Sequence, residues 1–343
     1  MKSDARGGYV KNLLCLSISI VIMLVSVVPL VSAVASPVQD DWVVESPEDH
    51  GMSSDLLEQA ADKIGEIGDR QGFVVVKDGV IVYEKYYRGD KYTKNFGFST
   101  SKSFGSTLIG ICVTQGLLNV DDLVTKWVPN PPLSIQPGAT IKHLLCQTSE
   151  SDPPGSEFHY DSGEVINTLS KIISAASNMR TNDFAKQYLL DPIGIKNSSW
   201  RTGNTITGEL AIGGGGFWTC RDQARLGLLY LNNGNWEGTQ IVSKDYIYDA
   251  THPSFPDANS VYGYLWWLNT PEGEWHRIFV SGTGKMLENA PGNMFMATGF
   301  LGQLIIVIPD LDIVVTTMGI TAQPETLYTL KDVWDAILPA LPD

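Results

Sequence analysis

Hydrophobic and polar positions follow a helical period and then a strand period near the start of the chain. From Ser54 to Ile67 the apolar residues recur at helical spacing, with a serine in place to cap the helix. Two β-rich runs follow, Phe73–Val76 and Val80–Tyr83, and the Asp-Gly pair between them is typical of a tight hairpin. The pattern therefore predicts a helix followed by two antiparallel strands.

The C-terminal part mirrors this arrangement. Leu304–Ile308 and Ile313–Thr317 are apolar runs separated by a Pro-Asp-Leu-Asp turn. Helical spacing of the apolar residues from Leu327 to Leu338 then predicts a final helix.

The two ends together predict an α/β fold. We expect residues 36–98 and 262–343 to form one antiparallel sheet flanked by helices, with residues 99–261 inserted as a mostly helical subdomain. A ligand site is expected in the cleft between the sheet and the insertion.

Residues 1–35 have the pattern of an export signal. Three basic residues between Lys2 and Lys11 precede an apolar run, and Ala33-Val-Ala35 supplies the small residues of a cleavage site. The apolar run approaches the ~20 residues that span a bilayer, so an uncleaved anchor is the alternative. In both cases the rest of the chain is expected outside the cytoplasm, periplasmic or secreted.

Composition narrows the class of partner. Of the 343 residues, 43% are hydrophobic and 18% charged, as in an ordinary globular protein, and the net charge is −14. This acidity argues against nucleic acid or an anionic membrane as the ligand, because both require clustered positive charge. We expect a small-molecule substrate, with membrane contact only through an uncleaved anchor. The sequence makes no prediction of oligomeric state.

The cysteines and histidines show no metal-binding spacing, and neither a metal nor an organic cofactor is expected. After removal of the signal the cysteines are Cys112, Cys146 and Cys220. At most one disulfide can form among three, and buried thiols are the favoured interpretation.

The first candidate for chemistry is Ser99-x-x-Lys102. By itself this pair is more typical of a capping serine and a surface lysine. Here an apolar stretch precedes it, an apolar helical face follows, and Gly116 is a natural stop, so both residues are expected on one face at the start of a buried helix. Burial that lowers the pKa of the lysine by about three units would make it a base for the serine.

Two further segments supply polar groups. Tyr160 and Ser162 enter another helical stretch, where the phenol can carry a proton to a leaving group. Thr298 and Gly299 precede the strand at Leu304, and the N–H groups of Phe300 and Ser99 are the expected oxyanion donors. Read singly, these segments are equally a structural tyrosine, a capping serine and a glycine bulge.

These three segments, in this order, resemble the serine β-lactamase and penicillin-binding-protein superfamily, whose signature is Ser-x-x-Lys, Ser-Asp-Asn and Lys-Thr-Gly. The chain is most similar to the class C β-lactamase branch and its esterase and amidase relatives, including 6-aminohexanoate-dimer hydrolases, over roughly residues 70–340. The resemblance implies a β-lactamase/transpeptidase-like fold.

It also implies roles for the candidate residues. Ser99 matches the nucleophile, Lys102 the base and Tyr160 the second proton carrier. Ser162 stands where β-lactamases have Asn and the nylon-oligomer-type hydrolases have Ser, and together with Thr298 and Gly299 it is expected to bind substrate. Ala297 stands where β-lactamases have a lysine that helps hold the β-lactam carboxylate.

The resulting hypothesis is an exported serine hydrolase that cleaves esters or amides through an acyl-enzyme. A β-lactamase or D,D-peptidase is the first alternative, and a non-catalytic binding or sensor domain on the same fold is the second. A structural cell-surface protein is disfavoured by the clustering of polar residues.

Three other features receive structural interpretations. Gly213–Gly216 is expected to be a flexible turn, and Ser281-Gly-Thr-Gly-Lys285 a glycine loop near the cleft. Among the nine tryptophans, Trp218, Trp266 and Trp267 are those expected near the pocket.

Overall fold

The computed structural model describes residues 42–161, 163–204, 209–323 and 325–342. The predicted signal, residues 1–35, lies outside the described residues. The α-helices are α1 (Ser54–Gly65), α2 (Thr100–Thr114), α3 (Val124–Trp127), α4 (Ile141–Leu145), α5 (Glu164–Ser177), α6 (Thr181–Ala185), α7 (Cys220–Leu231), α8 (Lys244–Ala250) and α9 (Thr326–Ile337).

The described strands form one six-stranded sheet, one three-stranded sheet (β3-β7-β4) and short two-stranded pairs. They are β1 (Asp69–Lys77), β2 (Val80–Tyr86), β3 (Asn95–Phe96), β4 (Ser199–Trp200), β5 (Thr202–Asn204), β6 (Glu209–Leu210), β7 (Gly216–Trp218), β8 (Asn235–Trp236), β9 (Thr239–Gln240), β10 (Trp267–Leu268), β11 (Glu274–His276), β12 (Ser281–Thr283), β13 (Phe295–Gly299), β14 (Gln303–Ile308) and β15 (Ile313–Ile320).

The large sheet joins the two ends of the chain. Its strand order is β10-β13-β14-β15-β1-β2, and every neighbouring pair is antiparallel. The N-terminal strand β1 lies beside the C-terminal strand β15, with Val75 opposite Val315. This confirms the predicted antiparallel α/β sheet built from both ends.

The predicted hairpin between β1 and β2 is confirmed. Its turn residues Asp78 and Gly79 both have positive φ, 52° and 83°. Those backbone angles match the right-handed twist of the paired strands, and they explain the Asp-Gly pair in the sequence.

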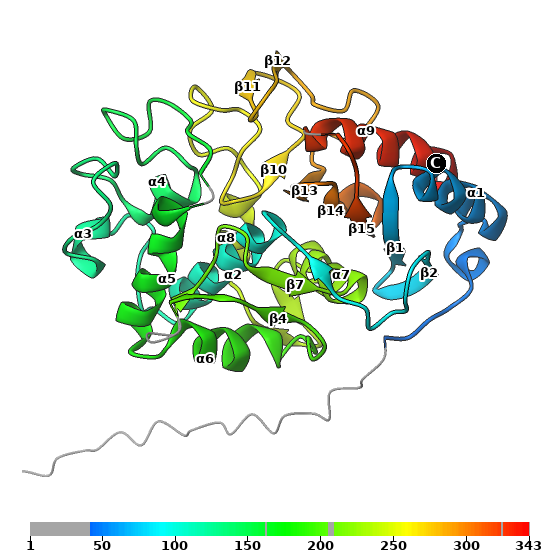
Figure 1. Cartoon of the computed structure of the whole chain (residues 1–343), viewed down its shortest axis with the longest axis horizontal. Helices are drawn as coiled ribbons and strands as arrows, with labels where there is room; N and C mark the ends of the chain where they lie inside the picture. Colours follow the sequence, from blue (N-terminus) through cyan, green and yellow to red (C-terminus); the bar gives the residue numbers. More distant parts are fainter. Residues whose placement is uncertain (1–41, 162, 205–208, 324, 343) are drawn as a thin grey trace, which may run out of the picture. The chain divides into compact units, whose positions relative to one another are not determined.

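Helices cover both faces of the sheet (Figure 1). The terminal helices α1 and α9 pack against each other beside the sheet, and α7 packs on β14, β15 and β1. The inner strands β1, β14 and β15 are therefore buried on both faces. The predicted cap of α1 was one residue out, because the side chain of Ser53, not Ser54, accepts the hydrogen bond from the N–H of Leu56.

Helix α2 passes through the interior, and its residues Thr100 to Cys112 are all buried. Phe104 stacks on Trp218 with ring centroids 3.9 Å apart, which fixes the helix against β7. Gly116, with φ of 70°, follows the helix as the predicted stop. Because its side chains are held on every side, the N-terminus of α2 is a rigid place for a reactive group.

The core is continuous from the sheet to the inserted helices, and the described residues belong to one compact unit. The proposed subdomain boundaries therefore stay a prediction. Cys112, Cys146 and Cys220 are free and buried, as expected.

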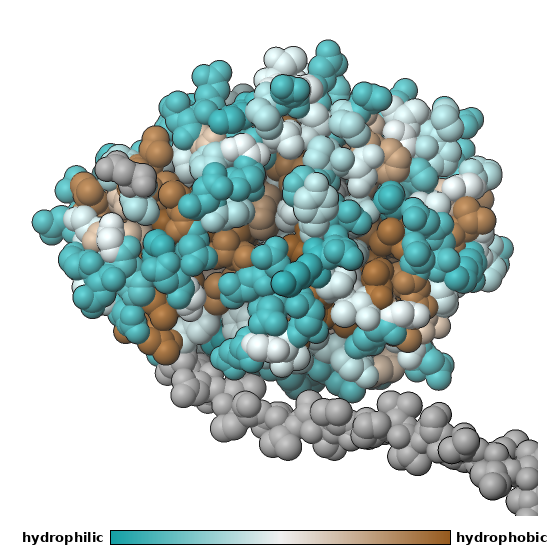
Figure 2. Space-filling view, turned by 180° about the vertical axis from the view of Figure 1, so that it is seen from behind, coloured by the Kyte–Doolittle hydropathy of each residue, from teal (hydrophilic) through white to brown (hydrophobic). Residues whose placement is uncertain are grey.

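The face seen in Figure 2 carries mainly hydrophilic side chains, with small hydrophobic groups between them. No helix in the described part of the chain is both long enough and apolar enough to cross a membrane.

Candidate active site

The structure brings Ser99 and Lys102 together at the start of α2. Ser99 is the N-cap residue, and Lys102 lies one turn further along the same face. The Nζ of Lys102 donates hydrogen bonds to the Oγ of Ser99 at 2.9 Å and to the carbonyl oxygen of Gly213 at 3.0 Å. Ser99 remains partly exposed whereas Lys102 is 1% exposed, so a substrate can reach the hydroxyl but not the amine.

Burial changes the protonation of this amine. It lowers the pKa of Lys102 from 10.5 to about 7, although the nearby carboxylate of Asp161 acts in the opposite direction. At neutral pH roughly half of the amines are then deprotonated, and these can accept the proton of Ser99.

Tyr160 lies over the same amine. It comes from the loop that enters α5, and the centroid of its ring is 4.5 Å from the Nζ of Lys102. Burial raises the pKa of Tyr160, while its hydrogen bond with Ser99 lowers it to a smaller extent. The phenol therefore keeps its proton at neutral pH. Its ring stacks on Trp267, with centroids 5.7 Å apart.

Gln147 and Asp161 hold the Tyr160 loop in place. The buried Gln147 side chain accepts from the N–H of Asp161 at 2.6 Å and donates to its carbonyl at 3.2 Å. The Asp161 carboxylate accepts from the N–H groups of Gly163 and Ile166, so it caps α5. Ser162 lies outside the described residues. The sequence reasoning did not find Gln147.

Thr298 and Gly299 lie at the end of β13, beside the segment that leads into Ser99. A Cβ on Gly299 would stand 2.3 Å from the carbonyl oxygen of Gly97. The glycine is therefore required by the contact between the two backbones, and its expected part in substrate binding stays a prediction. This contact holds the turn after β13 next to the start of α2.

The turn into Ser99 lies beside the turn that follows β13. Phe98 has a φ of 48°, an unfavourable conformation for a bulky residue, and it turns the chain sharply just before Ser99. The rings of Phe98 and Phe300 meet edge to face at 5.7 Å. Within the described residues neither the N–H of Ser99 nor that of Phe300 donates to a protein acceptor, and their expected role as oxyanion donors stays a prediction.

The glycine-rich segment 213–216 begins in a turn at residues 212–214, as expected, and it also contacts this site. Gly213 is buried, receives a hydrogen bond from Lys102 and donates one to the side chain of Asn167 at 2.9 Å. Gly216 donates to the hydroxyl of Ser101 at 2.9 Å. A run of glycines predicts a turn from sequence alone. Only the tertiary contacts reveal that the carbonyl of Gly213 accepts a hydrogen bond from Lys102.

Two other expectations were partly wrong. Trp267 lies at the site, but Trp218 and Trp266 are fully buried core residues, the latter packed on Tyr230. The segment 281–285 begins as strand β12 of a hairpin with β11, not as a loop.

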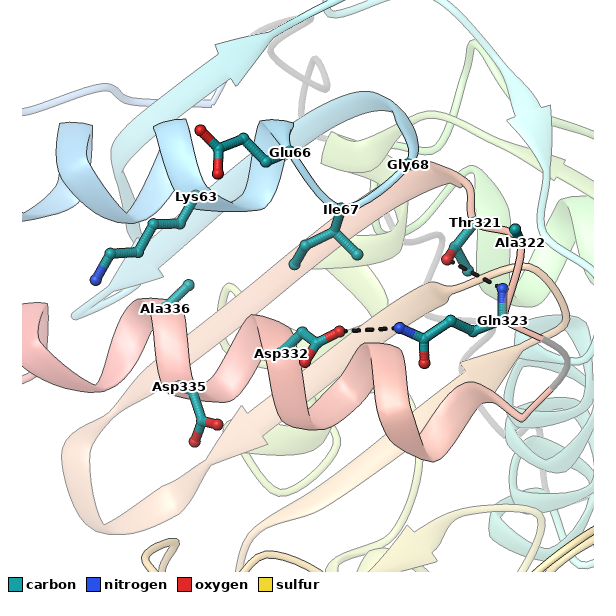
Figure 3. Close-up of a pocket in the computed structure, with 10 residues that line it drawn as sticks. All are labelled: Lys63, Glu66, Ile67, Gly68, Thr321, Ala322, Gln323, Asp332, Asp335 and Ala336. Atoms are coloured by element: carbon teal, nitrogen blue, oxygen red, sulfur yellow. Dashed lines mark hydrogen bonds between the residues drawn. The ribbon is translucent and has the colours of Figure 1, made fainter.

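A pocket of about 580 Å³ lies away from this site, between α1 and α9 (Figure 3). Its walls include Lys63 on one helix and Asp332 on the other, and the amide of Gln323 donates to Asp332 at 3.1 Å. The ionisable side chains that line this pocket are all exposed, so no buried base lies beside its Thr321 hydroxyl, and Ser99 is the better candidate for chemistry.

Comparisons with known proteins agree with the predicted fold. A family model described as Beta-lactamase matches residues 57–333. The fold is similar to that of a Bacillus anthracis protein provisionally assigned as a 6-aminohexanoate-dimer hydrolase, with a TM-score of 0.66, 20% identity and 88% of each chain covered.

Two further solved structures share the fold at low identity. A family VIII carboxylesterase matches with a TM-score of 0.66 and 13% identity, over 85% of this chain and 99% of the other. A beta-lactamase from Mycobacterium bovis matches with a TM-score of 0.62 and 18% identity, over 82% and 98%.

Proposed function

This chain belongs to the beta-lactamase family, and from that membership we propose that it is an exported serine hydrolase that cleaves an ester or amide through an acyl-enzyme. The observation that carries the proposal is the 2.9 Å hydrogen bond between the Ser99 hydroxyl and an amine with a pKa near 7. A serine becomes nucleophilic when such a base takes its proton.

In the first step the neutral amine of Lys102 takes the proton of Ser99 as Oγ attacks the substrate carbonyl. The positive charge that forms on Nζ faces the Tyr160 ring at 4.5 Å, which stabilises it by a cation–π contact. The negative charge on the carbonyl oxygen is held by the N–H groups of Ser99 and Phe300.

In the second step Tyr160 gives its proton to the leaving group, and the ammonium of Lys102 returns one to the phenol. The carbon–oxygen or carbon–nitrogen bond of the substrate breaks, leaving the acyl group on Ser99. Water then attacks the acyl carbon, and the same groups carry its proton in reverse. Thr298 and Ser162 are proposed to bind the substrate beside the scissile bond.

A labelling experiment tests the nucleophile. The mature protein and Ser99→Ala are exposed to a fluorophosphonate, with Ser103→Ala as the matched control because Ser103 lies one turn further along α2 and donates to the carbonyl of Leu265. We expect labelling of the wild type and the control only. Equal labelling of Ser99→Ala would refute the assignment.

A hydrolysis panel tests the reaction class. It contains p-nitrophenyl esters, short ω-amino-acid oligomers, D-amino-acid peptides and nitrocefin. We expect turnover of esters or linear amides. Turnover of nitrocefin or the D-amino-acid peptides alone would favour the β-lactamase or peptidase alternative, and no turnover with alanine-tolerant Lys102 and Tyr160 would favour a binding or sensor domain.

Export is part of the proposal and rests on the basic, apolar and small-residue pattern of residues 1–35. Intact-mass measurement of the protein recovered outside the cytoplasm tests it. Loss of residues 1–35 is expected, whereas an unprocessed chain in the membrane fraction would indicate the anchor.

A further inference from the structure

A second buried cation lies on the Tyr160 side of the site. Arg277 follows β11, and the centroid of the Trp267 ring is 4.0 Å from its guanidinium. The same Trp267 ring stacks on the Tyr160 ring, with centroids 5.7 Å apart. Tyr160 is the proposed proton donor to the leaving group, so Arg277 lies on the side of the site where the leaving group departs.

Arg277 also reaches the strand that borders the site. Its Nη2 donates to the hydroxyls of Thr298 and Thr326, each at 3.2 Å. Because the Thr298 oxygen accepts this hydrogen bond, its own proton is left to donate to a substrate. A guanidinium next to a substrate-facing hydroxyl would ordinarily attract an anion.

Here the positive charge of Arg277 is already balanced by the carboxylate of Glu325. The Nε of Arg277 forms an ion pair with Oε1 of Glu325 at 3.0 Å, and both side chains are only 2% exposed. The same oxygen accepts from the N–H of Leu327, which fixes the carboxylate as the N-cap of α9. At the neighbouring position on β13 the side chain is that of Ala297, which adds no charge.

We propose that the Arg277–Glu325 ion pair sets the specificity of this site, which selects substrates whose leaving group carries no carboxylate. The guanidinium supplies hydrogen bonds and a stacking surface, and Glu325 removes its net charge. This inference rests on the proposed hydrolase function and narrows it to leaving groups without a carboxylate. Of the substrates in the hydrolysis panel, it therefore favours the p-nitrophenyl esters over the ω-amino-acid oligomers, whose leaving group carries a carboxylate.

The substitution Glu325→Gln isolates the charge. The amide oxygen of glutamine can still accept from Arg277 and Leu327, and the second carboxylate oxygen of Glu325 has no hydrogen-bond partner among the described residues. The change therefore breaks no hydrogen bond and leaves the guanidinium with a net positive charge. Asp332→Asn is the matched control, because it removes an exposed carboxylate from the same helix away from the site.

The probes are two aryl esters, 3-carboxyphenyl butanoate and its uncharged analogue 3-carbamoylphenyl butanoate. Each kcat/KM is divided by the rate of hydroxide-catalysed hydrolysis of the same ester, which removes intrinsic reactivity. We expect the wild type and Asp332→Asn to prefer the uncharged ester by about tenfold or more, and Glu325→Gln to lower that preference about tenfold.

The outcomes separate the two proposals. Equal rates for the two esters in the wild type, or a preference for the carboxylate, overturn this inference whether or not Glu325→Gln folds. An unchanged preference in folded Glu325→Gln also overturns it. Turnover of neither ester, together with no fluorophosphonate labelling of Ser99, defeats the proposed function itself.

Discussion

Two buried basic residues contact the stacked rings of Tyr160 and Trp267, and their surroundings differ: Lys102 lies over Tyr160 and Arg277 over Trp267. Lys102 donates to a hydroxyl and a carbonyl, and burial lowers its pKa to about 7. Arg277 donates to the carboxylate of Glu325 at 3.0 Å within an equally buried setting.

Burial of a basic side chain therefore has two different outcomes in this molecule. An amine facing neutral acceptors loses its proton easily, which suits a base. A guanidinium facing a carboxylate keeps its proton and its geometry, which suits a positioning group. The predictions below follow from this contrast.

Exchanging the two cation types has the largest expected effect. Lys102→Arg places a group that stays protonated beside Ser99, and we expect kcat to fall about 10³- to 10⁴-fold. Arg277→Lys keeps one positive group next to Glu325, and we expect a loss of less than about tenfold. Steady-state kinetics with one neutral ester measures both. Comparable losses in the two variants would contradict the contrast.

Removing each charge should change stability in opposite directions. Arg277→Met leaves Glu325 buried without its counter-ion, and we expect the free energy of unfolding to fall by about 3–5 kcal/mol. Lys102→Met removes a buried amine, and we expect a rise of about 2 kcal/mol at pH 7. Urea unfolding at equilibrium measures both values.

The sign for Lys102 follows from proton binding. The unfolded amine binds a proton up to about pH 10.5, whereas the folded amine releases it near pH 7. Between these values the unfolded state binds more protons, so wild-type stability rises with pH. The advantage of Lys102→Met should therefore be greatest at or below pH 7 and shrink towards pH 10.5. An advantage that grows with pH would show the opposite linkage.

The pH dependence of kcat/KM in the wild type is expected to be a smaller effect than these substitutions. The base must be neutral, so kcat/KM for a neutral ester should fall about tenfold per unit below pH 7 and level off above it. Arg277→Lys should keep this midpoint, because its charge does not enter the proton transfer. A midpoint near pH 10 in the wild type would mean that Lys102 is not desolvated in solution.

Trp267 contacts both Arg277 and Tyr160, and its replacement has the smallest expected effect on kcat. Trp267→Leu removes the ring between Arg277 and Tyr160, and we expect kcat to fall about five- to tenfold with the pH midpoint unchanged. Trp266→Leu, in the core behind it, serves as a control that loses stability but keeps kcat once folded. A shifted midpoint in Trp267→Leu would mean that the ring tunes the base directly.

The local elements of this chain could be predicted because they depend on neighbours in sequence. The β1–β2 turn needs two residues at positive φ, and Asp78-Gly79 provides them. The extent of α2, from Ser99 to a stop near Gly116, likewise follows from the apolar periodicity and from the glycine at its end.

The contacts that complete the site were not predictable in the same way. The carbonyl of Gly213 and the side chain of Gln147 carry no sequence pattern that announces a role. Arg277 was also missed, because its partner Glu325 lies 48 residues away and on another element. Ion pairs of this kind depend on where β11 and α9 meet.

The sequence by itself determined the sheet from both chain ends, the buried helix that begins at Ser99, and the placement of a lysine one turn later, because periodicity and turn chemistry act over a few residues. Only the tertiary structure decided which buried cation became a base and which was neutralised. That choice depends on desolvation and on which groups the fold brings within hydrogen-bonding distance, and both are properties of the packed chain.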